Sequence, residues 1–438
     1  MSAPALRIGL AGLGTVGGGT FEVLDRNHGE IVRRAGRELR ITRVADLDVE
    51  RARALVRGRA EVLADARALA SDAAIDVVVE LIGGTGIARE VVLAAIAQGK
   101  HVVTANKALL AVHGNEIFAA ARERGVMVAF EAAVAGGIPI VKSIREGLAA
   151  NRIEWIAGIV NGTTNYILSE MRERGLPFVQ VLAEAQRLGY AESDPTFDIE
   201  GVDAAHKATI LASIAFGVPV RFDRAHVEGI SRLQAADIAW AEQLGYRIKL
   251  LAITRRHAHG IELRVHPTLV PARRLIANVE GAMNAVLVMG DAVGQTLFYG
   301  KGAGAEPTAS AVVADLVDVA RALGVEPGQR VPSLAFQPDA LADTPILPIG
   351  EVHTACYLRL RVDDRLGVLA DVTRLLADGD ISIEAMRQRA PAAGERETDI
   401  VILTHVALER RVDRAIAQIE ALPTVRPGVT RIRIEDLG

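Results

Sequence analysis

The densest group of residues that could do chemistry lies between residues 189 and 207, in the segment GYAESDPTFDIEGVDAAHK. Asp203 and Lys207 are four residues apart in a helical pattern, so their side chains share one helix face and can form an ion pair. The surrounding helix is strongly apolar, which indicates that this face is partly buried. With Glu192 and Asp198 on the preceding loop, three carboxylates and a lysine suit a zwitterionic substrate, with an ammonium group to bind and an oxygen to protonate. The plainer alternative is a surface helix with a salt bridge and a capped N-terminus.

Lysine is scarce in this chain, which makes each lysine worth attention. Of the 50 basic residues only six are lysines: Lys100, Lys107, Lys142, Lys207, Lys249 and Lys301. Arginine keeps its proton in proteins, whereas the pKa of lysine shifts on burial and the side chain can donate a proton. Lys107 ends the apolar run HVVTANK, which predicts a position at the carboxyl edge of a parallel sheet, where ligands of such sheets bind. The alternative is a solvated lysine in the polar cluster at a helix N-terminus.

A glycine-rich turn near the N-terminus predicts a dinucleotide site. Gly12-Leu13-Gly14-Thr15-Val16-Gly17 follows an apolar strand and opens a helix. Its first glycine permits the tight turn, the second lets the backbone approach a pyrophosphate, and the third lets the helix pack on the strand. Thr15 and Val16 begin the helix whose N–H groups would face the anion.

The second strand of this domain leaves the choice of cofactor open. A carboxylate at its end, Asp46 or Asp48, favours the free ribose hydroxyl of NAD, whereas arginine favours the 2′-phosphate of NADP. Three arginines lie nearby in the sequence, at positions 43, 51 and 53. These charges could also be no more than a solvated strand end.

Composition excludes several classes of protein. The 438 residues are 50% hydrophobic and 24% charged, which rules out a disordered chain and is enough for about three domains. The net charge of −4 gives no overall positive potential that would attract nucleic acid or an anionic membrane. The single cysteine, Cys356, cannot form an internal disulfide, and neither a signal peptide nor an 18-residue apolar span is present. We expect a cytoplasmic protein.

The first 132 residues predict an α/β domain with a doubly wound, Rossmann-type parallel sheet. Apolar runs such as Ile75–Ile82 are typical of buried parallel strands. Other strands are expected over Leu6–Gly12, Leu39–Asp46, His101–Thr104 and Val126–Ala129, with helices over Thr15–Leu24, Val49–Leu55 and Glu90–Gln98.

Two further domains are expected. Residues 133–325 mix longer helices, such as Val202–Phe216, with separated strands and predict an α+β domain. Residues 326–351 form a proline-rich linker. Residues 352–438 follow the order βαββαβ, which predicts a ferredoxin-like domain.

These motifs together resemble homoserine dehydrogenase of the long bacterial type. The matching segments are GLAGLGTVG, TANKALL, FEAAVAGGIPI, GIVNGTTNYIL, GYAESDPTFDIEGVDAAHK and GKGAGAEPTASAVVAD. The C-terminal region resembles an ACT domain, an amino-acid-sensing module, through Asp364-Arg365-Leu366-Gly367-Val368-Leu369. The resemblance implies NAD(P)H-dependent interconversion of L-aspartate 4-semialdehyde and L-homoserine, a step towards threonine, methionine and isoleucine.

The same resemblance implies roles for individual residues. Lys207 would donate and accept the proton of the substrate oxygen, Asp203 would orient Lys207, and Lys107 would lie beside cofactor and substrate. The implied substrate-binding residues are Glu192, Asp198, Gly162 and Thr163, and the implied cofactor-binding residues are Gly12, Gly14, Thr15, Val16, Gly17, Asp46, Gly83, Lys107, Gly302 and Gly304. A sodium site would involve Glu131, Val134, Gly136 and Ile138, and an effector site, with threonine as its ligand, Asp364 and Gly367.

The domain assignment and the assembly follow from the same resemblance. Residues 133–325 would be the catalytic and dimerisation domain, with about 301–325 returning to the nucleotide-binding domain, and residues 352–438 the ACT domain. We expect a homodimer or homotetramer. The alternative function is an inactive sensor of nucleotide and amino acid, which would have no need of the four polar residues Lys107, Glu192, Asp203 and Lys207.

Overall fold

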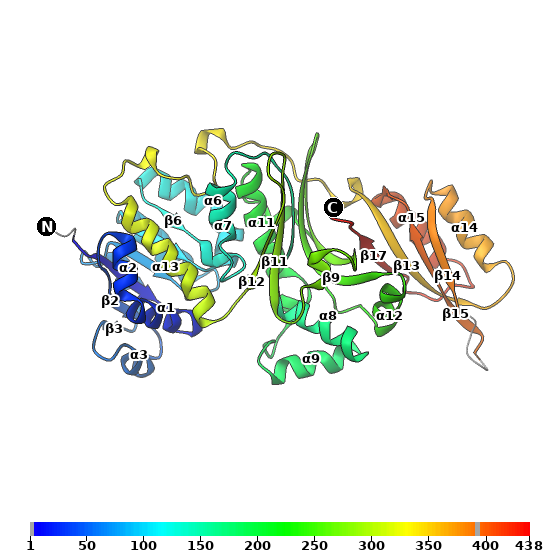
Figure 1. The fold of residues 1–438 in the computed structure, drawn as a ribbon, viewed down its shortest axis with the longest axis horizontal. Coiled ribbons are helices and arrows are strands. Elements are labelled where there is room, and N and C mark those ends of the chain that lie inside the picture. Colours follow the sequence, from blue (N-terminus) through cyan, green and yellow to red (C-terminus); the bar gives the residue numbers. More distant parts are fainter. Residues whose placement is uncertain (1–3, 390–394) are drawn as a thin grey trace. The chain divides into compact units, whose positions relative to one another are not determined.

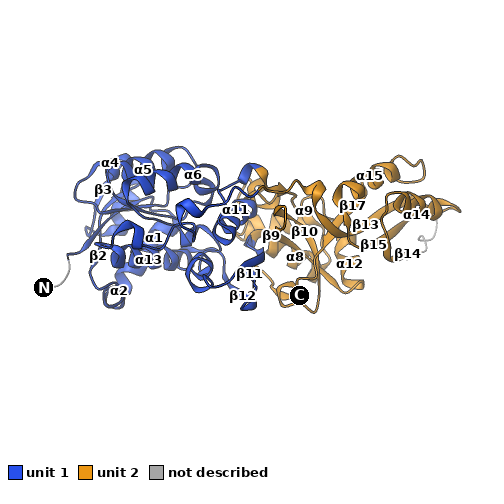
Figure 2. Cartoon of the chain, turned by 90° about the horizontal axis from the view of Figure 1, so that it is seen from above, with its two compact units in different colours: residues 1–162, 203–223, 282–344 blue, residues 163–202, 224–281, 345–438 orange. Residues whose placement is uncertain are grey.

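The computed structural model describes residues 4–389 and 395–438, in two compact units that are coloured separately in Figure 2. Unit 1 comprises Met1–Gly162, Asp203–Asp223 and Ala282–Thr344. Unit 2 comprises Thr163–Val202, Arg224–Gly281 and Pro345–Gly438. The chain therefore passes between the units several times, and each unit is built from segments that are distant in the sequence.

A six-stranded parallel sheet with the order β3-β2-β1-β4-β5-β6 forms the first part of unit 1. Its strands are β1 (Leu6–Ala11), β2 (Leu39–Ala45), β3 (Glu61–Leu63), β4 (Val77–Glu80), β5 (His101–Thr104) and β6 (Val128–Ala129). The predicted Rossmann-type sheet is confirmed. The strand order reverses between β1 and β4, and ligands of such sheets bind at that point, beyond the carboxyl ends of the strands.

Helices cover both faces of this sheet: α1 (Thr15–Arg26), α2 (His28–Ala35), α3 (Val49–Val56), α4 (Arg67–Ser71), α5 (Ile87–Ala97), α6 (Lys107–Arg124) and α13 (Ala305–Ala322). Helix α13, although far along the chain, lies beside α1 (Figure 1) and shares one apolar core with it and with β1 and β2. The contact is close at Gly19, where a Cβ atom would lie 2.6 Å from the carbonyl oxygen of Ala305. This approach requires glycine.

The rest of unit 1 holds α7 (Ile140–Lys142), the apolar helix α11 (Val202–Phe216) and an antiparallel array in the order β7-β11-β12. These strands are β7 (Ile153–Ile159), β11 (Met283–Gly290) and β12 (Gly294–Lys301). Every residue of α11 from Asp203 to Phe216 is buried, so any polar side chain on this helix needs partners inside the protein.

Unit 2 begins with the helices α8 (Gly162–Arg174), α9 (Phe178–Arg187), α10 (Thr196–Ile199) and α12 (Ala235–Gln243) and the short strand β8 (His226–Val227). Its longest element is the antiparallel hairpin of β9 (Tyr246–His257) and β10 (Gly260–Pro271). Both strands are longer than the segments Ile248–Thr254 and Ile261–Val265 that the apolar pattern predicts, because backbone pairing across the hairpin continues to Tyr246 and Pro271 at one end and to His257 and Gly260 at the other.

The C-terminal part of unit 2 has the predicted order βαββαβ. Its elements are β13 (His353–Asp363), α14 (Val368–Asp378), β14 (Ile383–Gln388), β15 (Glu397–Thr404), the two-residue β16 (Ala407–Leu408), α15 (Glu409–Glu420) and β17 (Thr430–Ile434). The strands lie in the order β17-β13-β15-β14 and the two helices share one apolar core with them. The predicted ferredoxin-like domain is thus confirmed. The segment before it contains single turns of 3-10 helix, at Pro327–Gln329, Pro338–Ala340 and Ile349–Glu351, and one β-bridge from Ile346 to Ile261.

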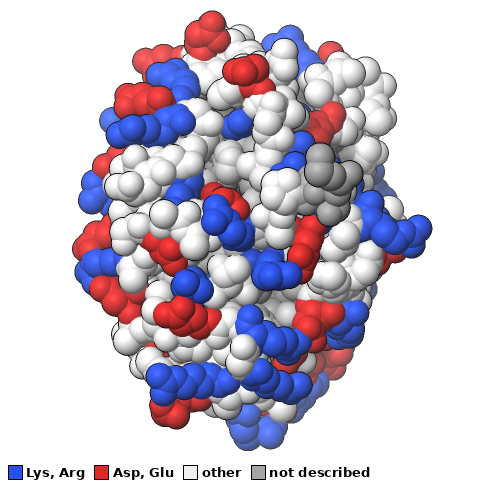
Figure 3. All heavy atoms as spheres, turned by 90° about the vertical axis from the view of Figure 1, so that its left-hand side faces the viewer, with Lys and Arg blue, Asp and Glu red and all other residues white. Residues whose placement is uncertain are grey.

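The surface agrees with the small net charge. Figure 3 shows a face over the parallel-sheet domain, on which Lys and Arg alternate with Asp and Glu. Charges of opposite sign in this domain are paired, for example Arg7 with Asp76 at 2.6 Å. Among the described residues, no helix is both long and apolar enough to cross a membrane.

His101 at the start of β5 makes the stability of the protein sensitive to acid. Its Nδ1 atom accepts a hydrogen bond from the N–H of Met127 at 2.9 Å, so the imidazole is neutral. Burial, together with the charge of Arg330, lowers the pKa of His101 from 6.5 to about 4. The unfolded chain therefore binds a proton at a higher pH than the folded chain does. The stability contributed by this group is complete above pH 6.5 and is lost as the pH falls from 6.5 to 4.

We predict that His101→Asn, which keeps an acceptor for Met127, flattens the pH dependence of the free energy of unfolding. Relative to its own value at pH 7.5, the variant should lose about 2 kcal/mol less than the wild type at pH 5. Urea denaturation at the two pH values measures this, with His113→Asn on α6 as the control. Equal losses in wild type and His101→Asn would contradict the prediction.

Candidate active site

The first two turns of α11 place an aspartate and a lysine together inside unit 1. The Nζ atom of Lys207 donates to Asp203 Oδ2 at 2.6 Å and to the carbonyl oxygen of Val160 at 2.7 Å. Both side chains are buried, Asp203 almost completely. The predicted i,i+4 pair is present, and it lies inside the protein rather than on a surface helix.

A second ammonium group reaches the same carboxylate. Lys107 Nζ lies 3.2 Å from Asp203 Oδ1, and Asn161 Nδ2 donates to Asp203 Oδ2 at 2.9 Å. Burial alone would raise the pKa of Asp203, but the charges of Lys207 and Lys107 and the hydrogen bonds hold it well below its usual value. Asp203 is therefore an anion that holds two cations in place. The side chain of Lys107 is 36% exposed, so this edge of the cluster is open.

Lys107 owes its position to the end of β5, as the TANK segment predicts. Asn106 caps α6 by accepting the N–H of Leu109 at 3.0 Å, which sets Lys107 as the first residue of the helix. The side chain of Thr104 donates to Glu80 Oε2 at 2.6 Å. The loop before α6 is thus tied at both ends.

Glu80 is a site residue that the sequence analysis missed. It is completely buried at the carboxyl end of β4, and its Oε1 atom accepts the N–H groups of Ile82 and Gly83 at 2.9 and 3.1 Å. One carboxylate thus holds the turn after β4 and, through Thr104, the turn after β5. The available signal was a single acid at the end of the apolar run VVVE, a position where a charge needs partners.

The glycine turn after β1 has the geometry that a pyrophosphate requires. Gly12 has a φ of +91°, and a Cβ atom on Gly17 would lie 1.9 Å from the carbonyl oxygen of Gly12, so only glycine fits there. A Cβ on Gly14 would meet nothing within 4 Å, which shows open space above the start of α1. A Cβ on Gly83 would also point into open space. These residues fit a bound dinucleotide, with the first turn of α1 (Thr15 and Val16) beneath its phosphates.

Asp46 supports this turn directly. Its Oδ2 atom accepts the N–H of Leu13 at 2.6 Å and its Oδ1 atom accepts the N–H of Asp48 at 2.9 Å. Arg51 Nη2 lies 3.4 Å from Asp46 Oδ2 and the side chain of Arg51 is about half exposed. Of the three nearby arginines, Arg43 pairs with Glu61 and Asp72, and Arg53 with Glu50.

The stretch Gly302–Gly304 lies close to a buried amide without partners. A Cβ on Gly302 would lie 2.0 Å from Asn284 Nδ2, and Asn284 is 1% exposed. Neither Nδ2 nor Oδ1 of Asn284 has a hydrogen-bond partner among the described residues. Because a buried amide without partners is costly, this position fits a bound group that supplies them.

The carboxylate of Glu131 fixes the start of the loop from Glu131 to Ile138 through hydrogen bonds to the backbone. Glu131 Oε1 and Oε2 accept the N–H groups of Val141 and Lys142 at 2.9 and 2.7 Å, and its own N–H donates to the buried Asp315. Burial and the nearby Glu131 raise the pKa of Asp315 well above its usual value. Among the described residues no cluster of three His, Cys, Asp or Glu side chains could hold a metal, so a cation here would depend on backbone carbonyl groups.

The remaining predicted substrate residues lie at the start of α8, in the loop after α9 (Glu192) and on the short helix α10 (Asp198), which was expected to be a loop. In unit 2, Thr163 Oγ1 donates to the carbonyl oxygen of Tyr190 at 2.7 Å and to Asp198 Oδ2 at 3.3 Å. Asp198 is half-buried and Glu192 is exposed. In unit 1, a Cβ on Gly162 would lie 2.8 Å from the carbonyl oxygen of Ala282, which leaves no room for a side chain.

Two further predicted features lie in the C-terminal domain. Gly367 has a φ of +92° and caps α14, directly after the completely exposed Leu366, and the N–H of Asp364 donates to the carbonyl oxygen of Arg396 at 2.8 Å. Burial raises the pKa of Cys356 on β13 to about 11, so its thiol is protonated and unreactive at neutral pH. The single cysteine is therefore unsuited to acyl transfer.

Comparison with known proteins agrees with this arrangement. The family models described as "Homoserine dehydrogenase, NAD binding domain", "Homoserine dehydrogenase" and "ACT domain" match residues 12–131, 139–317 and 357–424. A homoserine dehydrogenase of Pseudomonas aeruginosa is 60% identical over 99% of both chains. The crystal structure of a homoserine dehydrogenase from Thiobacillus denitrificans is 64% identical, with a TM-score of 0.96 over the whole of both chains. A hyperthermophilic archaeal homoserine dehydrogenase in complex with NADPH is 27% identical, with a TM-score of 0.62, over 72% of this chain and 97% of its own.

The fold and the dinucleotide turn, with these matches, define an NAD(P)-dependent oxidoreductase that carries a C-terminal ACT domain. Within that class, the chain belongs to the homoserine dehydrogenase family.

We predict that the single variant Asp203→Asn is less stable than the double variant that lacks both partners of the buried pair. Removing one partner leaves a buried charge without its counter-ion and should cost about 3–5 kcal/mol of the free energy of unfolding. The double variant Asp203→Asn with Lys207→Met should recover part of this loss, because the unpaired ammonium is gone. Urea denaturation of the wild type, Asp203→Asn and the double variant measures the difference. A double variant less stable than Asp203→Asn would contradict the prediction.

Proposed function

We propose that the chain catalyses the reversible, NAD(P)H-dependent reduction of L-aspartate 4-semialdehyde to L-homoserine, with Lys207 as the proton donor. The observation that carries the proposal is the buried cluster in which Asp203 holds the ammonium groups of Lys207 and Lys107. Membership of the homoserine dehydrogenase family supports the choice of substrate.

A bound dinucleotide would supply the hydride for the aldehyde carbon, and residues of this chain would stabilise the charge and donate the proton to the substrate oxygen. The carbonyl group of Val160 and the carboxylate of Asp203 fix the direction of the Lys207 ammonium. Asp203 stays ionised at neutral pH because its pKa is lowered, so it orients Lys207 without taking its proton. Two ammonium groups close together would stabilise the negative charge that develops on the substrate oxygen. Lys207 then gives up a proton, which an arginine could not do.

The polar groups of the loop before α11 would bind the amino-acid portion of the substrate. We propose that Glu192 and Asp198 bind the ammonium group of homoserine and that Gly162 and Thr163 contribute backbone and hydroxyl contacts. Support for this comes from the bond that Thr163 makes to Asp198, which holds that carboxylate in one orientation. The same bond ties α8 to the loop.

Sodium and threonine remain proposals from the same resemblance. Sodium would bind the carbonyl groups of Glu131, Val134, Gly136 and Ile138, and among the described residues no backbone N–H donates to the carbonyl oxygens of Val134 and Gly136. Threonine would bind at the turn of Asp364 and Gly367, in an assembly of at least two chains. The exposed turn before α14 supports a ligand or partner at this place.

We predict that Lys207→Met and Lys207→Arg each lower kcat for L-homoserine oxidation about 10³-fold, because both remove the transferable proton. The affinity for the reduced cofactor, measured by its fluorescence, should stay within about twofold of wild type. Steady-state assays with NAD and NADP side by side measure kcat. A folded wild type that turns over homoserine with neither cofactor would overturn the proposed function and favour the inactive sensor. An active Lys207→Met variant would overturn the role of Lys207.

We further propose that NADP(H) is accepted through Arg51. The carboxylate of Asp46 already accepts the N–H groups of Leu13 and Asp48. Of the three nearby arginines, Arg51 has the longest distances to carboxylate oxygens. The archaeal relative whose structure contains NADPH supports the choice.

We predict that Arg51→Ala lowers kcat/KM for NADP about tenfold and leaves that for NAD within about twofold, because only NADP carries the 2′-phosphate. Arg53→Ala is the matched control, since Arg53 pairs with Glu50 on the same helix. Equal effects on both cofactors would show that Arg51 does not select between them.

A further inference from the structure

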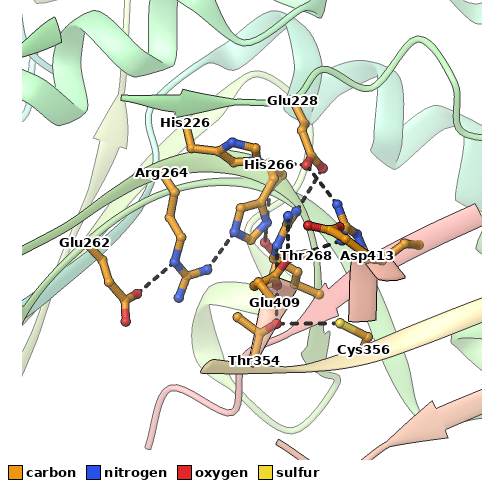
Figure 4. Close-up of polar contacts among 12 residues, drawn as sticks. His226, Glu228, Glu262, Arg264, His266, Thr268, Thr354, Cys356, Glu409 and Asp413 are labelled. Atoms are coloured by element: carbon orange, nitrogen blue, oxygen red, sulfur yellow. Dashed lines mark hydrogen bonds and ion pairs between the residues drawn. The ribbon is translucent and has the colours of Figure 1, made fainter. Parts of the chain in front are cut away.

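A buried ion network joins the ACT domain to the loop that carries Asp198. Its centre is Arg433 on β17, which is 1% exposed. Arg433 donates through Nε and Nη2 to both carboxylate oxygens of Glu409 at 2.8 and 3.0 Å, and through Nη1 to Glu228 Oε2 at 2.8 Å. Figure 4 shows that Glu228 and Glu409 come from different elements. One guanidinium group thus joins two carboxylates.

The two carboxylates belong to different parts of unit 2. Glu409 is the first residue of α15 in the ACT domain, and Glu228 directly follows β8. β17 lies between β10 and β13: Arg433 is opposite Thr268 on one side and Cys356 on the other. The last strand of the ACT domain is therefore a shared strand. A displacement of α15 or β17 would act directly on Glu228.

Glu228 is itself held in a narrow range of positions. His226 Nε2 lies 2.8 Å from Glu228 Oε1, and the N–H of Glu228 donates to the carbonyl oxygen of Val265 at 2.8 Å. Although burial would raise the pKa of Glu228, the bonds from His226 and Arg433 hold it well below its usual value. The carboxylate is therefore ionised, and losing Arg433 would leave a half-buried charge without its main partner.

The two residues after Glu228 pack on the end of α10. The N–H of Ile230 donates to the carbonyl oxygen of Ile199 at 2.8 Å. A Cβ on Gly229 would lie 2.4 Å from that same oxygen, so the two backbones are in direct contact. Ile199 is the residue after Asp198, and α10 is only four residues long. A shift of Glu228 therefore moves the segment that carries Asp198.

We propose that the Arg433–Glu228 ion pair is a positioning device for Asp198, through which the C-terminal strand of the ACT domain sets the affinity of the active site for homoserine. The inference rests on the proposed function in one respect, that Asp198 binds homoserine. Arg433 and Glu228 act through the backbone of residues 228–230 and 199 and do not touch the substrate.

The test uses the full-length variants Glu228→Gln and Arg433→Met in two assays. KM for homoserine should rise about tenfold in each, with kcat and the KM for NADP within about twofold of wild type, since the loop binds substrate and the proton donor is unchanged. Hydrogen exchange by mass spectrometry should show faster exchange of the amides in residues 196–201 and 230. The double variant should be no worse than Arg433→Met alone, because both changes break the same Arg433–Glu228 ion pair.

Arg359→Met is the matched control. Arg359 on β13 makes a buried ion pair with Asp237 on α12, at 2.6 Å, but neither residue bonds to residues 196–201. It should lower the melting temperature as Arg433→Met does and leave the KM for homoserine within about twofold of wild type.

Unchanged exchange of residues 196–201 and 230 in both Glu228→Gln and Arg433→Met would overturn the inference, whether or not the enzyme is active. An equal rise in KM in Arg359→Met would also overturn it, as general destabilisation would then suffice. A wild type without homoserine turnover would instead overturn the proposed function, and hydrogen exchange would still decide the coupling. Glu228→Gln preserves the size of the side chain and one hydrogen-bond acceptor. The test therefore remains possible even where the Arg433→Met variant does not fold.

Discussion

The buried carboxylate of Asp203 is the constraint on which the candidate site depends. Two ammonium groups would repel each other inside a protein, and an isolated carboxylate would be too costly to bury. Asp203 solves both problems, because Lys207 and Lys107 balance its burial while it fixes their positions. The same balance explains why α11, otherwise apolar, tolerates a charged first turn.

Carboxylates repeat this role at the edge of the parallel sheet. Glu80 holds the turns after β4 and β5, Asp46 holds the glycine turn after β1, and Glu131 holds the loop before α7. Each accepts backbone N–H groups that the strand or helix leaves without partners. The loops that would surround a dinucleotide are therefore organised by internal acids before any ligand binds, which lowers the entropy lost on binding.

The sequence predicts those parts of the structure whose signals are local. Helix α11 and strand β5 agree with the predicted bounds residue for residue, because each is a clear apolar segment with clear ends. The sequence analysis places only the start of helix α6. Its charged and small residues give no clear apolar periodicity, although tertiary packing buries one face of the helix. The Asp203–Lys207 pair follows from spacing alone. The contact of Lys107 with Asp203 and the bond of Glu80 to Thr104 depend on tertiary structure and have no local signal.

The few lysines of this chain also have structural roles. Three of the six lysines are buried, and each donates to a backbone carbonyl group: Lys100 to Asp72 and Ile75, Lys207 to Val160, and Lys249 to Val279. A compact ammonium group fits among carbonyl groups where the planar guanidinium of arginine does not. Arginine instead takes the places with two carboxylate oxygens to bind, as Arg433 does with Glu409. A buried lysine therefore marks a tightly packed site, and its surroundings distinguish a proton donor from a lysine with a structural role. Lys207 differs from Lys100 and Lys249 in its bond to a buried carboxylate that a second, partly exposed lysine also reaches.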